Sequence, residues 1–316
     1  MDLSVVIPVY NETESLPLLH EELVSSIEKL SLDYEIIYVD DGSQDDSFIT
    51  LERIHQKWEN VVRVIRFRKN FGQTAAISAG FDYAKGDIII SMDADMQNDP
   101  SDIPLLLEKI DEGYDLVNGW RHDRKDTFIN RRLPSIIANK IISYTTNVKL
   151  HDYGCTLKAF KKDVVKNTKL YGEMHRFLPA IASYYGVSIA EVKVNHRPRR
   201  FGKAKYGISR TIKVILDLIT VKFLLSYSTR PIQIFGLLGF YSGGLGFLIA
   251  PYLTFMHQFY GIPMGNRPIL QLAILLIFMG LQFISIGLIA ELQARTYHET
   301  QNKSIYSIKK ILIKDS

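Results

Sequence analysis

The sequence predicts an α/β protein with a mainly parallel sheet, followed by two helices that cross a membrane. Three observations support this prediction. The chain has 316 residues, more than one average domain. In its first third, short apolar runs rich in β-branched residues alternate with segments in which apolar residues recur every three or four positions. Toward the C-terminus, two long runs contain no Asp, Glu, Lys or Arg.

The alternating part is expected to hold five strands, at residues 3–10, 35–41, 61–67, 87–92 and 114–120. The first run lacks a basic lead-in and continues directly into Asn11 and Glu12, so we interpret it as a strand and not as a signal peptide. Helices are expected between the strands, at residues 16–30, 45–54, 70–84 and 104–110. This order predicts right-handed crossovers with helices on both faces of the sheet, an architecture that binds nucleotides.

Two carboxylates follow the predicted fourth strand, Asp93 and Asp95, with the Gln97 amide two residues further on. Residues i and i+2 of an extended segment share a face, so these side chains can present oxygens in one direction. Open α/β sheets bind ligands at this end of their strands, and hard oxygen ligands suit Mg²⁺ or Mn²⁺ holding a diphosphate. A lone Asp-x-Asp is also typical of a turn or a helix N-cap, and that alternative stays open for the pair taken alone.

Two groups of basic residues lie downstream of this candidate metal site. The first comprises Arg121, Arg124, Lys125, Arg131 and Arg132, ahead of a predicted helix at 135–144. The second surrounds Gly202 and comprises His196, Arg197, Arg199, Arg200, Lys203 and Lys205. The guanidinium group of arginine, which can donate two parallel hydrogen bonds, and the ammonium group of lysine both bind phosphate groups well. A run of charge is also typical of a solvated face.

The two uncharged runs span residues 231–255 and 269–290, which are 25 and 22 residues long. A helix needs about 20 apolar residues to cross a bilayer, so we expect two transmembrane helices. Two buried helices of a soluble core are the alternative. Glycines in both runs would let the helices approach closely, either within one chain or between copies in a homo-oligomer.

Charge around these runs predicts their orientation. Basic residues flank the outer ends, whereas the loop between them contains Arg267 as its one fixed cation. The positive-inside rule then places both termini in the cytoplasm and the loop outside, in the inner membrane if the cell is bacterial. Residues 208–225 carry apolar side chains on one side and Arg210, Lys213 and Lys222 elsewhere. This pattern favours a helix in the membrane interface, with a helix packed on the soluble domain as the alternative.

The expected division of the chain follows from these patterns. It comprises a cytoplasmic α/β domain at 1–205, juxtamembrane amphipathic helices at 206–230, a first transmembrane helix at 231–256, an external loop at 257–268, a second transmembrane helix at 269–292 and a cytoplasmic tail at 293–316. The formal net charge of +4 is modest and gives no indication of nucleic-acid binding. Cys155 is the single cysteine, so no disulfide within the chain is possible and a reducing compartment is compatible.

The Asp pair, the basic groups and the membrane anchor together suit one reaction class. A nucleotide sugar could bind at the sheet edge with its diphosphate on a metal, while a lipid phosphate approached from the bilayer. A phosphomonoester has its second pKa near 6, so it is already a nucleophile at neutral pH and needs no strong base. The protein would then supply alignment and neutralisation of charge.

The chain resembles glycosyltransferase family 2 in four ordered segments, which are VIPVYNE at 6–12, VDDGSQD at 39–45, NFGQ at 70–73 and DADMQNDP at 93–100. It is most similar to the family's polyprenyl-phosphate glycosyltransferases, which include dolichyl-phosphate mannosyltransferases and bacterial undecaprenyl-phosphate glucose and 4-formamido-arabinose transferases. Residues 152–155 with Lys158, and residues 199–206, resemble the arabinose-type members. Four motifs in the right order are far more specific than one Asp-x-Asp.

The resemblance implies a Rossmann-like GT-A nucleotide-sugar domain and inverting transfer from a UDP- or GDP-linked sugar to undecaprenyl or dolichyl phosphate, for cell-envelope glycan or lipid modification. The implied nucleotide-sugar contacts are Pro8, Tyr10, Glu12, Asp41, Gln73, Asp93, Arg199 and Lys205. The implied metal ligands are Asp93, Asp95 and Gln97, and the implied contacts to the acceptor phosphate are Arg121, Arg131 or Arg132, and Ser135.

Two departures from the resemblance concern catalysis. Some relatives carry an Asp directly after the glycine equivalent to Gly154, proposed as a base, where this chain has Cys155. A base role would then fall to Asp152 or to no residue, and Cys155 is expected to be a small packed residue. Relatives often have Ser before the loop lysine, where this chain has Ala204, so one hydroxyl contact is missing.

Two other functions compete with lipid-phosphate glycosylation. A processive polysaccharide synthase shares the first domain, but such enzymes resemble one another in a Gln-x-x-Arg-Trp motif, and neither Trp58 nor Trp120 stands in that context. A membrane-anchored sugar-nucleotide sensor would not need the complete set of acidic and basic groups. The sequence leaves the sugar open among glucose, mannose, an N-acetylhexosamine and a modified arabinose.

Overall fold

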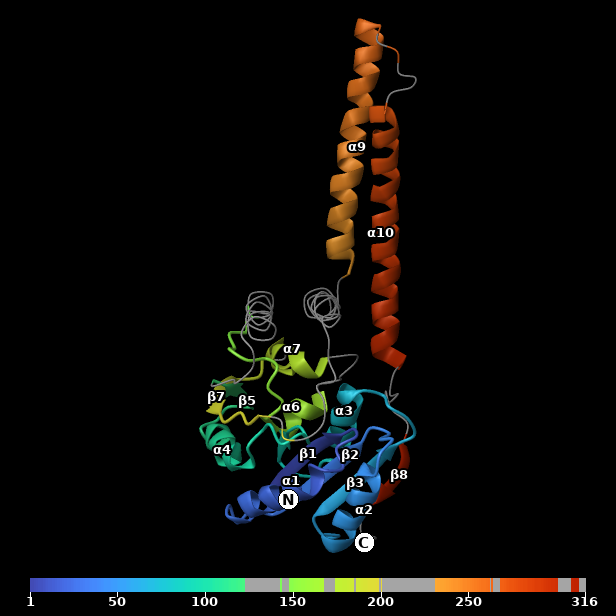
Figure 1. The fold of residues 1–316 in the computed structure, drawn as a ribbon. Helices are drawn as coiled ribbons and strands as arrows, with labels where there is room; N and C mark the ends of the chain where they lie inside the picture. Colours follow the sequence, from blue (N-terminus) through green and yellow to red (C-terminus); the bar gives the residue numbers. More distant parts are fainter. Residues whose placement is uncertain are drawn as a thin grey trace. The chain divides into compact units, whose positions relative to one another are not determined.

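The structure is a computed structural model of the chain. It describes residues 1–122, 143, 148–167, 174–184, 186–198, 200, 231–261, 263, 268–300 and 308–312. These residues fall into two compact units (Figure 1). One is an α/β unit that also includes the strand near the C-terminus, and the other is a hairpin of two long helices.

A single eight-stranded sheet forms the centre of the α/β unit, in the order β7-β5-β6-β4-β1-β2-β3-β8. The strands are β1 (Leu3–Val9), β2 (Tyr34–Asp40), β3 (Val62–Phe67), β4 (Ile88–Ser91), β5 (Leu116–Arg121), β6 (Lys158–Lys161), β7 (Ile189–Val194) and β8 (Ile308–Leu312). Strands β1 to β4 are mutually parallel, and β7 is parallel to β5. Only β6 and β8 run against their neighbours among the described strands, so the prediction of a mainly parallel sheet is confirmed.

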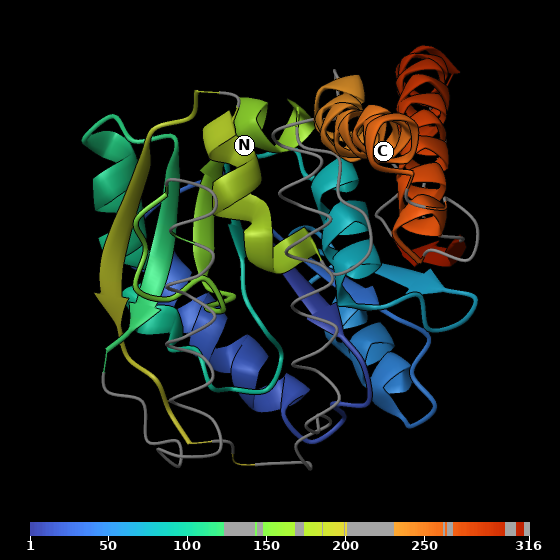
Figure 2. The same cartoon turned by 90° about the horizontal axis from the view of Figure 1, so that it is seen from above.

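Helices cover both faces of this sheet. They are α1 (Leu16–Glu28), α2 (Ser47–Lys57), α3 (Gln73–Tyr83), α4 (Ile103–Asp111), α6 (Lys162–Asn167) and α7 (Leu178–Tyr184), with short 3₁₀ turns at Pro100–Asp102 and Met174–Phe177. Alternate residues of β1 separate the two faces: Val5 and Ile7 join the core under α1, α2 and α4, whereas Val6 meets α3. Figure 2 shows α1 and α2 on one side of the sheet and α3 on the other.

The five predicted strands correspond to β1 to β5, with ends that differ by one or two residues. The predicted helix at 16–30 corresponds to α1, whose buried Leu16, Leu19, Leu23 and Ile27 follow the helical period. The sequence prediction missed β6, β7 and β8. Strands β6 (KAFK) and β8 (IKKIL) are short and contain two lysines each, and β7 (IAEVKV) contains a glutamate and a lysine. The predicted tail at 293–316 contains β8 as well as the end of a longer helix.

The strand β8 lies antiparallel beside β3 at the edge of the sheet, with Val64 opposite Leu312 and Arg66 opposite Lys310. The Lys310 ammonium lies 2.7 Å from the Glu52 carboxylate on α2. Leu312 packs against the core of the α/β unit. A segment that follows both long helices in sequence therefore completes the sheet that begins with residue 3.

The helix hairpin consists of α9 (Ile232–Tyr260) and α10 (Pro268–Thr300). The two helices meet through glycines: a Cβ added at Gly239 would lie 2.7 Å from the Gly280 carbonyl oxygen, and one at Gly246 would lie 2.6 Å from the Ala273 carbonyl oxygen. Contacts this close require residues without side chains.

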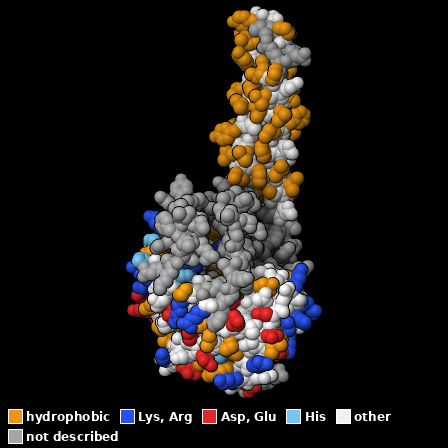
Figure 3. Space-filling view, viewed as in Figure 1, with side chains coloured by type: hydrophobic (Ala, Val, Ile, Leu, Met, Phe, Trp, Pro, Cys, Tyr) orange, Lys and Arg blue, Asp and Glu red, His pale blue; other side chains and the backbone are white. Residues whose placement is uncertain are grey.

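Both helices contain a stretch long and apolar enough to cross a membrane, of which 11% in α9 and 17% in α10 is buried. Apolar side chains lie along the face of the hairpin seen in Figure 3, and large apolar side chains of both helices are exposed, as expected of membrane spans and not of core helices in a soluble domain. They indicate a membrane protein. Helix α10 continues to Thr300, beyond the predicted end of the span at 292, and the predicted interfacial helix at 208–225 lies outside the described residues.

Replacing Gly80 with alanine is expected to lower the free energy of unfolding of the α/β unit by about 1–3 kcal/mol, because the core is overpacked. Gly80 lies on α3 against β1, and an added Cβ would lie 2.1 Å from Val6 Cγ1. Urea unfolding measures the change. Val6→Ala removes the colliding methyl groups, so Gly80→Ala should cost less in that background. Equal costs in both backgrounds would contradict this packing.

Candidate active site

The site lies at the carboxyl end of β1, where the order of strands in the sheet reverses. Strand β1 is followed by β2 on one side, whereas the connection after β3 returns to β4 on the other side of β1. Such a switch point leaves a crevice in which open α/β sheets bind ligands. The described residues of the predicted site follow the strand ends at this edge or begin the adjacent helix: Tyr10, Glu12, Asp41, Gln73, Asp93, Asp95, Gln97, Arg121 and Asp152.

Asp93 is held by side chains from two different segments. Gln73 Nε2, at the first turn of α3, donates to Asp93 Oδ1 at 2.7 Å. The Thr156 side chain also hydrogen-bonds to Asp93, and Asn98 Nδ2 donates to Thr156 Oγ1 at 2.9 Å. These contacts fix the carboxylate before any ligand is present.

Asp95 belongs to a tight turn beside Asp93. Its Oδ1 accepts the Gln97 backbone N–H at 3.1 Å, and Met96 between them has a φ of 59°, in the left-handed region. The turn that the sequence offered as an alternative is therefore present. It does not replace a ligand role, since an Asx-type hydrogen bond uses one lone pair of one oxygen.

Burial, and then the negative charge of Asp95, raise the pKa of Asp93, while Thr156, Arg121 and Lys158 oppose that shift. Two carboxylates that repel each other in a buried site favour a proton or a cation between them. A divalent metal fits this pair for that reason. Among the described residues no group of three or more His, Cys, Asp or Glu side chains is arranged to hold a metal. The groups at this edge that could hold such an ion are the two aspartates and the Gln97 amide, together with oxygens of a bound diphosphate.

Asp41 follows the end of β2, which is next to β1 in the sheet. Its Oδ1 accepts the Phe71 backbone N–H at 2.7 Å and its Oδ2 accepts that of Gly72 at 2.9 Å. Burial raises the pKa of Asp41 to about 6 in spite of these hydrogen bonds. The carboxylate thus ties the end of β2 to the segment that enters α3, which is the segment that carries Gln73.

Glycine is required where these segments cross. Gly42 has a φ of +68°, and an added Cβ would lie 2.5 Å from the Lys69 carbonyl carbon. On the β1 side, the Asn11 carboxamide oxygen accepts the Gln44 N–H at 2.8 Å, and the Glu12 N–H donates to Ser47 Oγ at 2.8 Å. Tyr10 and Glu12 therefore sit on a loop that is braced against the residues after β2, and Pro8 lies inside β1 itself.

Arg121, the last residue of β5, forms an ion pair with Asp152 through two contacts. Its Nε lies 2.7 Å from Asp152 Oδ2 and its Nη2 lies 2.9 Å from Asp152 Oδ1. The ammonium of Lys158 is buried nearby and donates to the carbonyl oxygens of Tyr153 and Cys155. Cys155 is fully buried, and burial raises the pKa of its thiol, as expected of a packed residue and not of a nucleophile.

The second basic group begins beside the Asp93–Gln97 segment. The Arg197 N–H donates to the Gln97 carbonyl oxygen at 2.9 Å, and its guanidinium pairs with Glu22 at 2.5 Å and Asp99 at 2.8 Å. Arg197 is therefore engaged in holding the fold. The predicted phosphate contacts Arg131, Arg132, Ser135, Arg199 and Lys205 lie outside the described residues.

Sequence reasoning did not identify Thr156, Asn98, Asn118 or Glu191, which position the residues that it did identify. Asn98 directly follows Gln97, but its contact with Thr156 spans 58 residues. Glu191 and Asn118 both bind the chain at Asp152, from strands β7 and β5. No local pattern in the sequence signals contacts of this kind, because they depend on the order of strands in the sheet.

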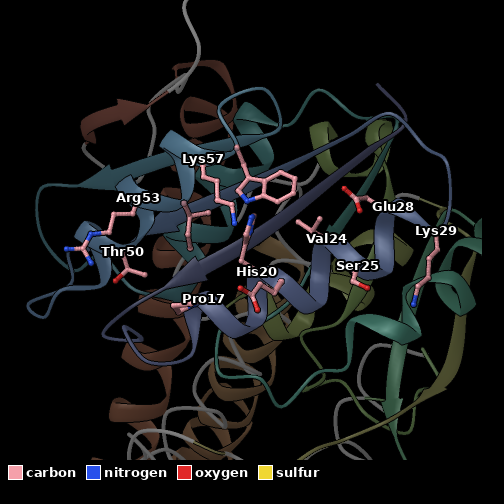
Figure 4. Close-up of a pocket in the computed structure, with 12 residues that line it drawn as sticks. Pro17, His20, Val24, Ser25, Glu28, Lys29, Thr50, Arg53 and Lys57 are labelled. Atoms are coloured by element: carbon pink, nitrogen blue, oxygen red, sulfur yellow. The ribbon is translucent and has the colours of Figure 1, made fainter.

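A hollow between α1 and α2 is separate from this site, and no predicted site residue lines it (Figure 4). Its walls include His20 and Trp58, whose rings meet edge to face at 5.5 Å. His20 Nδ1 lies 3.0 Å from the Tyr38 hydroxyl, and burial lowers the pKa of His20 to about 4. The hollow has no group in common with the chemistry at Asp93.

Solved structures share this fold. The glucosyl-3-phosphoglycerate synthase of Mycobacterium tuberculosis, in complex with Mn²⁺ and uridine-diphosphate-glucose, superposes with a TM-score of 0.55 over 70% of this chain and 78% of that one, at 19% identity. A structure of the same enzyme in complex with Mn²⁺, uridine-diphosphate-glucose and phosphoglyceric acid gives the same score at 20% identity, over 71% of this chain and 79% of that one. At this level of identity the likeness shows the fold, which is GT-A-like.

Closer relatives match almost the whole chain. The dodecaprenyl-phosphate galacturonate synthase of Rhizobium johnstonii is 41% identical over 314 residues, which cover 98% of this chain and 93% of the relative. An undecaprenyl-phosphate 4-deoxy-4-formamido-L-arabinose transferase of Shewanella sediminis is 36% identical over 312 residues, covering 98% and 92%. Residues 4–168, which contain Asp41, Asp93, Asp95, Arg121 and Asp152, match the glycosyl transferase family 2. The protein belongs to glycosyl transferase family 2 and is a glycosyltransferase.

Proposed function

We propose that this protein transfers one sugar from a nucleoside-diphosphate sugar to a membrane polyprenyl phosphate, with inversion at the anomeric carbon. The observation that carries the proposal is that two relatives named for polyprenyl-phosphate products match 98% of the chain, including both long helices. Asp93 and Asp95, at the carboxyl end of β4, support the same function. A match limited to the α/β unit would leave open whether the acceptor is a lipid or a soluble molecule.

On the donor side, Pro8, Tyr10, Glu12 and Asp41 line the nucleotide pocket, and Asp93, Asp95 and Gln97 hold Mg²⁺ or Mn²⁺. A bound divalent ion would neutralise charge on the departing diphosphate. The fit of this group rests on the repulsion between the two carboxylates and on the rigid support of Asp93 by Gln73 and Thr156. Arg199 and Lys205 contact the donor diphosphate or the acceptor.

On the acceptor side, Arg121, Arg131 or Arg132, and Ser135 hold the lipid phosphate. A phosphate oxygen attacks the anomeric carbon from the face opposite the diphosphate. The new C–O bond forms as the bond to the diphosphate breaks, and the bonding pair leaves with the diphosphate. Since the acceptor is already anionic at neutral pH, the residues of the site align it and balance its charge.

A transfer assay tests this proposal. Purified full-length protein in mixed micelles with undecaprenyl phosphate is supplied with Mn²⁺ and labelled UDP-galacturonic acid, UDP-4-deoxy-4-formamido-arabinose, UDP-glucose, UDP-N-acetylglucosamine or GDP-mannose. We expect metal-dependent label in an organic-extractable lipid that carries one sugar. A growing polymer would instead support a processive synthase, and nucleotide binding without transfer from any donor would support a sensor.

The proposal also places the α/β unit and both termini in the cytoplasm. Pairing of β8 with β3 supports one common side, because a chain that leaves the sheet and returns to it must cross a membrane an even number of times. The basic residues that flank the outer ends of the two spans favour the cytoplasm as that side. Cys155 is fully buried, so the wild-type chain is a silent background for maleimide labelling. We expect an impermeant maleimide to label Tyr260→Cys in intact spheroplasts and Lys309→Cys only after permeabilisation. The opposite pattern would invert the orientation.

A further inference from the structure

Several contacts hold the Arg121 and Asp152 side chains in a fixed arrangement. Both oxygens of the Asp152 carboxylate face the Arg121 guanidinium, and Oδ1 also accepts the Gly154 N–H at 3.1 Å. The Asp152 side chain is only 4% exposed and that of Arg121 only 16%. A two-point, charge-assisted pair of this kind fixes the plane of the guanidinium.

The backbone of Asp152 is held from two neighbouring strands. Glu191 on β7 accepts the backbone N–H groups of His151 at 3.0 Å and of Asp152 at 3.1 Å. From β5, Asn118 Nδ2 donates to the Asp152 carbonyl oxygen at 2.8 Å. The backbone of Asp152 is therefore held by the sheet independently of Arg121.

Within the part of the chain that the structure describes, the Arg121 guanidinium has N–H donors that Asp152 does not use. Arginine has five N–H groups, and the contacts from Nε and Nη2 use two of them. Arg121 ends β5 and Asp93 follows β4, and because both strands run antiparallel to β6, their carboxyl ends lie at the same edge of the sheet. An arginine aligned in this way presents its remaining N–H groups to an anion in a fixed direction.

We propose that Asp152 is a positioning residue, which aligns Arg121 for the acceptor phosphate, and is not the proton acceptor of the reaction. This inference rests on the proposed function above and deepens it. A base would need a lone pair directed at the acceptor, whereas this carboxylate is directed at an arginine. A phosphomonoester dianion carries no proton on the attacking oxygen that a base must remove.

A double-mutant cycle tests the inference with full-length protein. Asp152→Asn should raise KM for polyprenyl phosphate by about ten- to a hundredfold and leave KM for the nucleotide sugar nearly unchanged. In an Arg121→Ala background, Asp152→Asn should have little further effect, because its target is gone. A base would behave differently: kcat would fall by about 10²–10⁴-fold, and the two losses would multiply. Multiplying losses overturn the inference.

Gly154→Ala provides a second variant that keeps the Asp152 carboxyl group. The added methyl group would lie 3.1 Å from Arg121 Nη2 and 3.5 Å from Asp152 Oδ1, so the guanidinium must shift by a few tenths of an ångström out of its alignment with Asp152. The acceptor KM should rise as in Asp152→Asn, whereas a wild-type acceptor KM would contradict the inference even if Asp152→Asn does not fold. As matched control, Asp115→Asn breaks an ion pair with Lys161 at the opposite end of the same strands and should leave both KM values unchanged.

Failure of this inference is distinguishable from failure of the proposed function. If the wild-type enzyme makes a polyprenyl-phosphate sugar but the losses multiply, only the role of Asp152 is wrong. If the wild-type enzyme transfers no sugar from any donor in the panel, the proposed function itself is wrong.

Discussion

Asp95→Ala is expected to abolish sugar transfer, with a loss of at least about 10³-fold in kcat/KM, because the leaving diphosphate would lose its metal. Titration of Mn²⁺ into the nucleotide-bound protein, followed by electron paramagnetic resonance, should show the same loss without relying on activity. Asp87→Ala, at the exposed opposite end of β4, is the matched control and should retain wild-type transfer. Retained transfer in Asp95→Ala would remove the metal assignment.

The same variant should lose less stability than the wild type as the pH rises in the absence of metal. Burial and the charge of Asp95 raise the pKa of Asp93. The folded protein therefore binds this proton more tightly than the unfolded chain, and metal-free stability falls as the pH rises from about 3.9 through the raised value. Removing Asp95 makes this fall smaller, although it also removes the hydrogen bond to the Gln97 N–H. The melting temperature of Asp95→Ala relative to wild type, measured in chelator, should therefore increase from pH 4 to pH 8; a difference that stays constant or decreases would contradict the repulsion.

Arg121→Ala is expected to lower kcat/KM for polyprenyl phosphate by about 10²–10³-fold, since it removes the donors that we propose for the acceptor anion and takes the guanidinium away from the buried Asp152 carboxylate. Binding of the nucleotide sugar, measured by isothermal titration calorimetry, should change little. Arg121→Lys keeps the charge without the two-point pairing and should recover only part of the activity.

Two observations would count against this role of Arg121. Arg63→Lys, which preserves the charge of another strand arginine that pairs with a buried carboxylate, Glu35, is the control and should behave as wild type. If Arg121→Ala weakens nucleotide-sugar binding more than acceptor use, Arg121 belongs to the donor side.

The predictable part of the fold is the part with local periodicity. Strands β1, β2 and β4 are mainly apolar and mostly buried, and α1 shows a stripe of buried apolar residues at helical spacing. Strands β6 and β8 show no such apolar run. The sequence of β6 is KAFK, and β8 contains two exposed lysines, which are common at a sheet edge. Their place depends on partners far away in the chain, and no periodicity encodes that.

The candidate site shows the same division. Asp93, Asp95 and Arg121 are visible because each follows a predictable strand, and parallel strands bring their carboxyl ends to one edge. The roles of Asp152 and Thr156 depend on β6, whose antiparallel entry brings the residues before it back to that edge. A cluster of basic residues in the sequence also does not reveal which of its members are free to bind phosphate. Arg197 belongs to such a cluster, but in the structure it is paired with Glu22 and Asp99.

The late strand β8 has a consequence for biosynthesis. Lys310 and Glu52 are 258 residues apart in the sequence, so the outer edge of β3 stays unpaired until the ribosome has delivered both apolar helices. An open edge strand is a template for aggregation. With both helices crossing the membrane as we propose, a nascent chain in which only one of them inserted would leave residues 308–312 on the other side of the bilayer, with that edge still open. Correct insertion of both helices is then a condition for completing the sheet.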